Sequence, residues 1–272
     1  MASQPHPAAT PERAPLRSNS FREYYEALFA AHGPQHWWPG RTSFEVIVGA
    51  ILVQNTSWTN VEPAIERLRR EKLLTPRAIE CVSLPRLEKL IHSSGYFRQK
   101  AKKLKAFVKF LRDEYQGSVA KMARAETQTL RPQLLAIHGI GPETADSILL
   151  YAVGHPVFVV DAYARRILER HGHQLHFVRD GKSRPLNYEE IRQLFERELP
   201  RDPRLYNEFH ALIVQTGKRY CRPKNPICGG CPLKTFLPNE IAGPTSLTEA
   251  PSTISPSSTS LTSSNSSASV PA

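Results

Sequence analysis

The sequence predicts an all-α protein, and two observations support that fold class. Between residues 20 and 236 the apolar residues recur at helical spacing, and no stretch shows sustained alternation of apolar and polar residues. Gly, Pro and Asn residues separate these helical segments from one another. Of the 272 residues, 40% are hydrophobic, which is enough for a sizeable core. The chain can therefore form one large or two modest helical domains.

The individual helices can be placed from their start and stop signals. Ser20 and Glu23 form a capping box before a helix that ends at Gly33, Ser43 can cap the next, and Thr56 or Ser57 can start a third. The two ends, residues 1–17 and 239–272, are rich in Pro and Ala or in Ser, Thr and Pro, and we expect them to be disordered. Further helices are expected at about 76–82, 85–93, 98–115, 130–136, 142–153, 161–171, 187–198 and 203–218.

The charge balance favours a polyanionic partner. Lys and Arg exceed Asp and Glu by 36 to 25, which gives a formal net charge of +11 and a pI near 9.7. The longest apolar run, residues 44–53, is far shorter than the roughly 20 residues needed to cross a bilayer, so we expect no membrane partner. No secretory signal is visible, and we expect a cytoplasmic protein, associated with the nucleoid if it is bacterial.

The segment from Leu134 to Asp146 has the pattern of a helix, a tight turn and a second helix. Gly139 and Gly141 flank Ile140 in the turn, and Pro142 suits a first helical position. Glycines at these positions leave backbone N–H groups free to bind a phosphate oxygen, which would position DNA without reading its sequence. Glu143 and Thr144 begin the second helix and would lie beside the DNA. The alternative is an ordinary helical hairpin with a glycine turn.

An acidic residue at the start of another helix is a candidate catalytic group. Asp161 follows the apolar segment 157–160 and precedes the helical segment 162–168. A helix N-terminus favours the ionised carboxylate, and cleavage of an N-glycosidic bond needs such a group because the sugar develops positive charge as the base departs. A plain N-cap is the alternative reading, and a cap can also be catalytic.

Basic residues follow one another at spacings of three and four along the segment 98–115. Such spacing places them on one helix face, where they could contact phosphates or simply be solvated. Binding to phosphates would weaken steeply with salt. The residues of this basic face are Arg98, Lys102, Lys105, Lys109 and Arg112.

Taken together, the hairpin Gly139–Gly141 and the segment Val159–Asp161 resemble the helix-hairpin-helix and Gly/Pro-Asp signature of the endonuclease III superfamily, the HhH-GPD DNA glycosylases. Ile51–Thr56 resembles the family's segment with a glutamine at a helix end. Ser94–Ala101 resembles its loop before a basic helix. With a cysteine segment near the C-terminus, the likeness spans roughly residues 20–236.

The resemblance implies a two-lobed fold and a DNA-repair activity. It predicts a six-helix barrel at residues 42–154, packed against a second helical lobe built from 18–41 and 155–238, with the active cleft between the lobes. A monomer would flip a damaged base out of double-stranded DNA and cleave its bond to the sugar. In the family, the position of Gln54 enters the gap left by the flipped base, and the position of Tyr96 wedges the opposite side. Without the family, a solvated polar group and a core aromatic would be the simpler readings.

One position departs from the pattern of the strand-cutting members. Those members carry a lysine two residues beyond the second hairpin glycine, where this chain has Glu143. A carboxylate cannot form an imine with the sugar, so we expect hydrolysis by water directed from Asp161. The resemblance therefore favours the monofunctional members.

Three tryptophans make the chain most similar to the branch that excises 3-methyladenine. Trp37, Trp38 and Trp58 could form a base pocket, because aromatic faces attract the positive charge of an alkylated purine. Lys218 could face the same pocket. The alternative is that the tryptophans fill the core.

The cysteine segment matches only part of the family's iron-sulfur pattern. Cys221, Cys228 and Cys231 have the spacing of three ligands of a 4Fe-4S cluster, but Leu237 occupies the fourth position. An intact cluster completed by a water or by a carboxylate such as Glu240, a partial cluster, and a chain without any cofactor all stay open. Zinc fits less well because no histidine follows His210. Cys81 is expected to be a buried thiol in the barrel.

Two other functions remain compatible with the sequence. One is a glycosylase for mismatched or oxidised bases, with or without strand cleavage. The other is a DNA-binding protein that keeps the hairpin but has lost catalysis. The retained Asp161 argues against the second.

Overall fold

The computed structural model describes residues 20–38, 40–173, 175–179 and 182–238. The predicted disordered ends, residues 1–17 and 239–272, lie outside the described residues. Every described residue belongs to one compact unit, Met1–Ala242.

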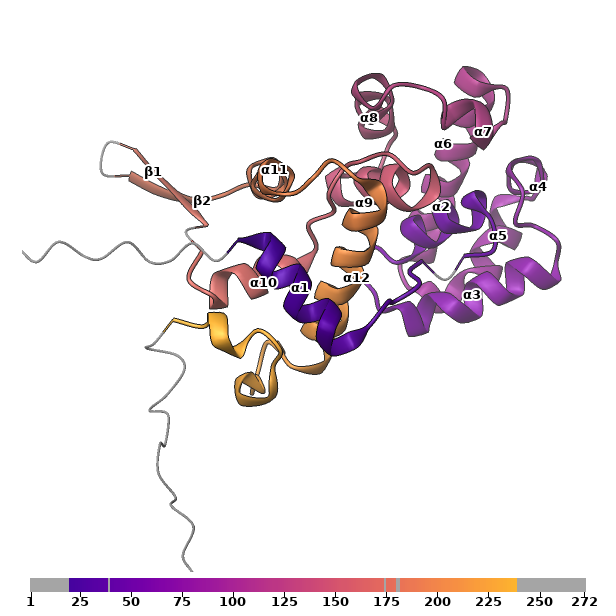
Figure 1. Cartoon of the computed structure of the whole chain (residues 1–272). Coiled ribbons are helices and arrows are strands. Elements are labelled where there is room, and N and C mark those ends of the chain that lie inside the picture. Colours follow the sequence, from indigo (N-terminus) through magenta and orange to yellow (C-terminus); the bar gives the residue numbers. More distant parts are fainter. Residues whose placement is uncertain (1–19, 39, 174, 180–181, 239–272) are drawn as a thin grey trace, which may run out of the picture. The chain divides into compact units, whose positions relative to one another are not determined.

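The all-α prediction is confirmed (Figure 1). A short antiparallel hairpin of β1 (His176–Arg179) and β2 (Lys182–Pro185) was not predicted, because four-residue strands are too short to show alternation. The α-helices of the described residues are α1 (Phe21–His32), α2 (Ser43–Leu52), α3 (Trp58–Arg70), α4 (Pro76–Cys81), α5 (Leu84–Leu90), α6 (Phe97–Tyr115), α7 (Val119–Met122), α8 (Thr127–Ala136), α9 (Pro142–Ser147), α10 (Ala162–Arg170), α11 (Tyr188–Glu198) and α12 (Pro203–Arg219).

The capping signals locate most helix starts correctly. Ser20 and Glu23 form the predicted capping box of α1. The start of α2 is a correction: Thr42, not Ser43, is the N-cap, because Thr42 is extended and its hydroxyl accepts the backbone N–H of Glu45 at 3.1 Å. The expected helix 142–153 is α9 followed by a π-helical turn, η2 (Ile148–Ala152).

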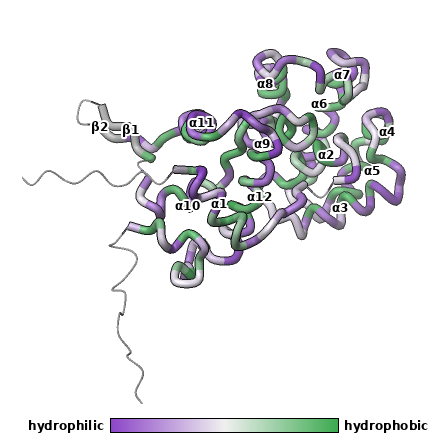
Figure 2. Tube along the Cα trace, viewed as in Figure 1, coloured by the Kyte–Doolittle hydropathy of each residue, from purple (hydrophilic) through white to green (hydrophobic). Residues whose placement is uncertain are grey.

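Two hydrophobic clusters organise the described residues. The first gathers the buried faces of α2 to α9, and α2 lies at its centre because nine of its ten residues are buried. The second cluster gathers α1, α10, α11 and α12. Green and purple segments alternate along most helices in Figure 2, as expected for helices that bury one face. The two-lobed helical fold is therefore as predicted.

A buried ion pair connects the two clusters. The Arg131 guanidinium of α8 donates two hydrogen bonds, of 2.6 and 3.0 Å, to the Asp146 carboxylate of α9, which is fully buried. Arg131 also pairs with Glu189 of α11, and Arg192 of α11 lies 4.0 Å from Asp146. These contacts tie the hairpin helices α8 and α9 to α11.

Candidate active site

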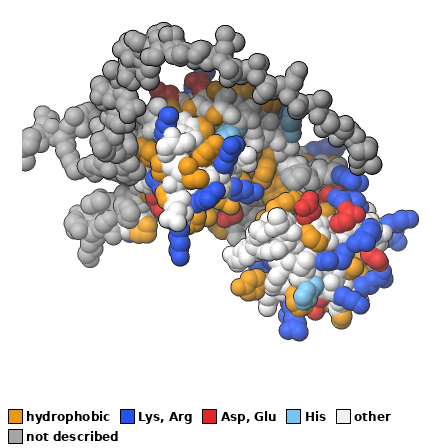
Figure 3. Space-filling view, turned by 90° about the horizontal axis from the view of Figure 1, so that it is seen from below, with side chains coloured by type: hydrophobic (Ala, Val, Ile, Leu, Met, Phe, Trp, Pro, Cys, Tyr) orange, Lys and Arg blue, Asp and Glu red, His pale blue; other side chains and the backbone are white. Residues whose placement is uncertain are grey.

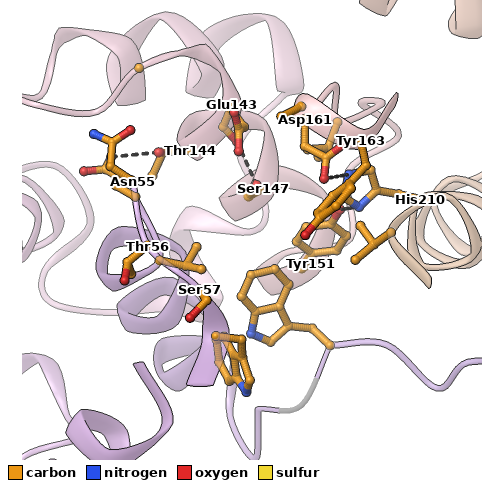
Figure 4. A pocket seen from close by; sticks show the side chains of 18 of the residues that line it. Asn55, Thr56, Ser57, Glu143, Thr144, Ser147, Tyr151, Asp161, Tyr163 and His210 are labelled. Carbon is orange, nitrogen blue, oxygen red and sulfur yellow. Dashed lines mark hydrogen bonds and ion pairs between the residues drawn. The ribbon is translucent and has the colours of Figure 1, made fainter. Parts of the chain in front are cut away.

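A cavity of about 910 Å³ lies where α3, α9, α10 and α12 meet (Figure 4). Its walls come from both hydrophobic clusters: Trp58 packs against the first, Tyr163 packs against the second, and Tyr151 packs against both. The structure brings nine of the predicted site residues to this cavity: Trp37, Trp38, Gln54, Trp58, Gly141, Glu143, Thr144, Asp161 and Lys218 line it.

The glycine turn folds as the sequence indicates. Gly139 has a φ of 81°, a left-handed conformation that glycine adopts without strain. A side chain there would also collide with the stem of Lys103, because an added Cβ would lie 2.5 Å from the Lys103 Cε. Ile140 is only 4% exposed and anchors the turn in the first cluster, while Gly141 precedes α9 as its N-cap. The turn thus has a rigid base and an accessible backbone.

Gln54 is held against this turn. Its amide nitrogen donates to the Gly139 carbonyl at 3.1 Å and to the Thr144 hydroxyl at 2.8 Å, and its amide oxygen accepts a hydrogen bond from the Lys103 amine. These two contacts join Gln54 to residues that lie 85 and 90 positions later in the sequence. Lys103, which the sequence analysis did not single out, therefore links Gln54 to the hairpin.

Tyr96 lies on the surface and does not line the cavity. Its side chain is 71% exposed, and its φ of 44° places it in the left-handed region just before α6. The buried Lys100 supports this loop by donating from its amine to the Ser94 carbonyl at 2.6 Å. Burial lowers the pKa of Lys100 to about 8. Because the Tyr96 side chain is exposed, the alternative that it is a core aromatic is excluded.

The basic face of α6 is only partly free. Arg98 and Lys102 are exposed, whereas the Lys105 amine donates to the backbone carbonyls of Glu80 (2.7 Å) and Val82. Burial lowers the pKa of Lys105. Two further members, Lys109 and Arg112, pair with acidic side chains. Figure 3 shows Lys and Arg side chains scattered over the face in view and mixed with other residue types.

Asp161 begins α10 and points its carboxylate toward the cavity (Figure 4). One oxygen accepts the backbone N–H of Ala164 at 2.8 Å, so the predicted cap is present, and the side chain is only 14% exposed. Burial alone would raise the pKa of Asp161. The nearby His210, followed by the backbone N–H groups of Ala164 and Tyr163, lowers that pKa overall. The carboxylate is therefore held negative.

His210 and Tyr151 complete this arrangement, and sequence reasoning missed both as site residues. His210 Nε2 lies 3.6 Å from an Asp161 oxygen, and His210 Nδ1 lies 2.6 Å from the Tyr151 hydroxyl. When His210 carries its proton on Nε2, its Nδ1 accepts a hydrogen bond from the Tyr151 hydroxyl and its Nε2–H points at the Asp161 carboxylate. One signal was available: His210, Val214 and Lys218 follow at spacings of four on α12, so they share the face that lines the cavity.

Glu143 lies at the start of α9 and also lines the cavity. Its side chain remains accessible at the cavity surface. Partial removal from water by the neighbouring residues, and next the negative charge of Asp161, raise the pKa of Glu143, whereas His210 lowers it. Among the described residues, no hydrogen bond or ion pair involves the Glu143 carboxylate. The two acids of the cavity are thus in different electrostatic environments.

The three tryptophans form a connected aromatic wall. Trp38 meets Trp58 and Trp37 edge to face, at centroid distances of 5.3 and 5.4 Å, and stacks on Tyr151 at 5.0 Å. The Lys218 amine lies 5.8 Å from the Trp37 ring centroid. Trp38 and Trp58 pack against the first cluster, and all three tryptophans line the cavity, while their role in binding a base stays a prediction.

The cysteine loop does not supply the donors of a four-thiolate cluster. Burial, and then the charges of Cys221 and Cys228, raise the pKa of Cys231, but Leu237 offers no donor at the fourth position. Glu240 lies outside the described residues. The Cys221 sulfur instead accepts a hydrogen bond from Arg170 at 2.9 Å. No group of three or more His, Cys, Asp or Glu within the described part of the chain is arranged to hold a metal ion.

Cys81 is a correction, because its thiol is exposed and not buried. It ends the six-residue helix α4, whose buried residue is Ile79. Residues two apart on a helix point to roughly opposite sides, so burial of Ile79 places Cys81 outside.

The described helices include none that is long and apolar enough to span a membrane.

Comparisons with known proteins agree on a family. The family model for the HhH-GPD superfamily of base excision DNA repair proteins matches residues 48–197. A DNA repair glycosylase of Methanocaldococcus jannaschii, whose assignment is itself provisional, is 45% identical over 226 residues, covering 81% of this chain and 98% of that protein. Endonuclease III of Thermotoga maritima is 30% identical over 191 residues, covering 70% and 80% of the two chains.

Two solved structures share the fold. The Helicobacter pylori 3-methyladenine DNA glycosylase MagIII, bound to 1,N6-ethenoadenine, superposes with a TM-score of 0.62 at 27% identity and covers 72% of this chain and 96% of that one. A trapped covalent intermediate of endonuclease III with DNA gives a TM-score of 0.65 at 25% identity, covering 80% and 93%. The family match, which spans more than half of the chain, and the cavity-lining Asp161 beside the hairpin together show that this chain belongs to the HhH-GPD superfamily of base excision DNA repair proteins.

Proposed function

We propose that the protein is a monofunctional DNA N-glycosylase, which hydrolyses the bond between a damaged base and its deoxyribose. The observation that carries the proposal is the Asp161 carboxylate, held negative by His210 at the edge of a cavity large enough for a nucleobase. A negative carboxylate stabilises the positive charge that develops on the sugar, and it orients the water that attacks the anomeric carbon.

The residue at the hairpin favours hydrolysis over strand cleavage. Glu143 replaces the amine that would form an imine with the sugar. Two other amines line the cavity, but Lys103 is bound to Gln54 and Lys218 lies over Trp37. Both amines are thus used in contacts with neighbouring side chains, which supports a water nucleophile.

The proposed leading substrate class is the alkylated purines. The aromatic wall offers stacking surfaces, and stacking on a protein ring is a general way to hold a flipped base. The structural relative from H. pylori is a 3-methyladenine glycosylase and was solved with a modified adenine. Mismatched or oxidised bases are the second candidate class, and a relative from Aeropyrum pernix, a thymine-DNA glycosylase 27% identical over 188 residues, supports the mismatched bases.

We propose that double-stranded DNA binds across the hairpin and the start of α6. The backbone N–H groups of Gly139 and Gly141 would hold one phosphate, because the Ile140 N–H already donates to the Ile137 carbonyl, and the exposed Arg98 and Lys102 would hold others. The exposed Tyr96 would enter the base stack on the opposite side. Gln54 would reach the gap left by the flipped base after its bonds to the hairpin open.

A panel of duplexes tests the proposal. Each duplex carries one modified or mispaired base, and release of free base is measured for the wild type and for Asp161→Asn. We expect release from at least one alkylated-purine duplex by the wild type and none above background by the variant. Release from none of the duplexes, with DNA binding intact, would support the non-catalytic DNA-binding alternative.

The cysteine loop takes no part in the proposed chemistry, and we propose a structural role for it. Arg166 and Arg170 of α10 bind the Cys221 carbonyl and sulfur, and Leu233 is buried in the second cluster. An iron and sulfide assay of anaerobically purified protein tests whether these thiols hold a cluster. Stoichiometric iron and sulfide would show that a cluster is kept, and absence of iron would show that the thiols hold none.

A further inference from the structure

We propose that Glu143 is a second catalytic carboxyl group, a general acid that protonates a neutral base as it leaves the sugar. The proposal rests on the N-glycosylase function above and deepens it, because it extends the substrate class from cationic alkylated purines to neutral modified purines.

The placement of Glu143 fits a group that meets the substrate. It follows the hairpin directly, in the first turn of α9, and lines the same cavity as Asp161 (Figure 4). In the part of the chain that the structure describes, its carboxylate has no hydrogen-bond or ion-pair partner. Asp146, three residues later on the same helix, is the structural contrast: it is fully buried and bound by Arg131 through two hydrogen bonds. Glu143 makes no comparable structural contact.

The electrostatic environment of the cavity shifts the pKa values of Asp161 and Glu143 in opposite directions. His210 and backbone N–H groups lower the pKa of Asp161, whereas the surrounding protein and the Asp161 charge raise the pKa of Glu143. Two carboxyl groups whose pKa values are pushed apart are suited to different roles, one as a proton donor and the other as an anion. The other titratable groups of the cavity wall are Lys103, Tyr151, Tyr163, Tyr188, His210 and Lys218.

The need for a proton depends on the charge of the departing base. A base that already carries a positive charge, such as 7-methylguanine, leaves with its bonding electron pair and becomes neutral. A neutral base would leave as an anion unless a proton arrives on a ring nitrogen. The Lys218 amine lies 5.8 Å from the Trp37 ring centroid. A cationic base beside Trp37 would be repelled by this ammonium group, whereas a neutral base would not.

The step balances with one water. Protonated Glu143 transfers its proton to a ring nitrogen of the base while the bond to C1′ breaks, and the electron pair of that bond stays with the base. A water oxygen then bonds to C1′ and its proton passes to the Asp161 carboxylate. Proton exchange with solvent restores both carboxyl groups.

Comparison of two substrates in one pair of enzymes tests this role. Base release under single-turnover conditions is measured for the wild type and Glu143→Gln, on duplexes carrying either 7-methylguanine or 1,N6-ethenoadenine. Glutamine keeps the size of the side chain but cannot donate an acidic proton. We expect Glu143→Gln to lose about 10²- to 10⁴-fold on the neutral base and only a few-fold on the cationic base.

Controls separate this inference from the proposed function. Glu143→Asp, which keeps an acid, should recover part of the rate on the neutral base, and Asp161→Asn should lose both activities. Equal losses on the two substrates in Glu143→Gln, no loss on either, or a wild type that releases only the cationic base would overturn the role of Glu143 while leaving the glycosylase function intact. A wild type that releases neither base from these duplexes, nor any base from the wider panel, would instead overturn the glycosylase function itself.

Discussion

Replacing Arg131 by methionine should destabilise the protein strongly, because it removes the main partner of a buried charge. Asp146 has no exposed side-chain area, and it would lose two hydrogen bonds of 2.6 and 3.0 Å. Burial raises the pKa of Asp146, and Arg131 is the largest influence that opposes this rise. Arg131→Met therefore leaves a carboxylate that must either stay charged in the interior or take up a proton.

The magnitude follows from what remains around Asp146. Breaking a buried ion pair by removing one partner costs about 3–5 kcal/mol. Arg192 stays 4.0 Å from the carboxylate and can compensate in part, so we expect about 3 kcal/mol, at the lower end of that range. The lost pair with Glu189 adds little, because that side chain is 38% exposed.

Urea unfolding followed by tryptophan fluorescence measures the effect. The matched control is the double variant Arg131→Met/Asp146→Leu, which removes both charges and should recover most of the lost free energy of unfolding. A loss below about 1 kcal/mol in the single variant, or a double variant as unstable as the single one, would refute the reasoning.

Three further predictions concern the cavity and the DNA surface. Gly217→Ala should reduce base release, because an added Cβ would lie 2.4 Å from the Tyr163 ring in the cavity wall; unchanged single-turnover rates would contradict this. Lys102→Ala should lower the slope of log affinity against log salt by about one, measured by fluorescence anisotropy; an unchanged slope would remove it from the phosphate contacts. Release of a neutral base should fall at low pH, as Asp161 is protonated below its lowered pKa, and at high pH, as Glu143 ionises above its raised pKa; a flat profile would oppose both roles.

Local signals made much of the fold predictable. The capping box at Ser20, the Pro142 start of α9 and the Asp161 cap of α10 each depend on neighbours three or four residues away, so the sequence contains both partners. The hairpin was also predictable, because Gly139 acts through its own left-handed backbone conformation and Pro142 suits the first position of α9. These local features position Asp161 and Glu143, which carry the proposed chemistry.

Contacts between distant segments were not predictable from one sequence. Tyr151 and His210 are 59 residues apart, and only the packing of α12 against η2 brings them together. Lys105 looked like a surface cation because its spacing matched Arg98 and Lys102, but the carbonyls that bind it come from the end of α4 and the residue that follows. Periodicity gives the face of a helix and not what covers that face.

The central claim is that water, and not a protein amine, attacks the sugar. One reaction tests it directly: the wild type is incubated under single-turnover conditions with its best-released duplex in borohydride, and free base, strand integrity and protein–DNA adducts are measured together. The account predicts free base, an abasic strand that stays intact until alkali is added, and no covalent adduct. An adduct that forms at the rate of base release would contradict it, and would point to Lys103 or Lys218 as the nucleophile.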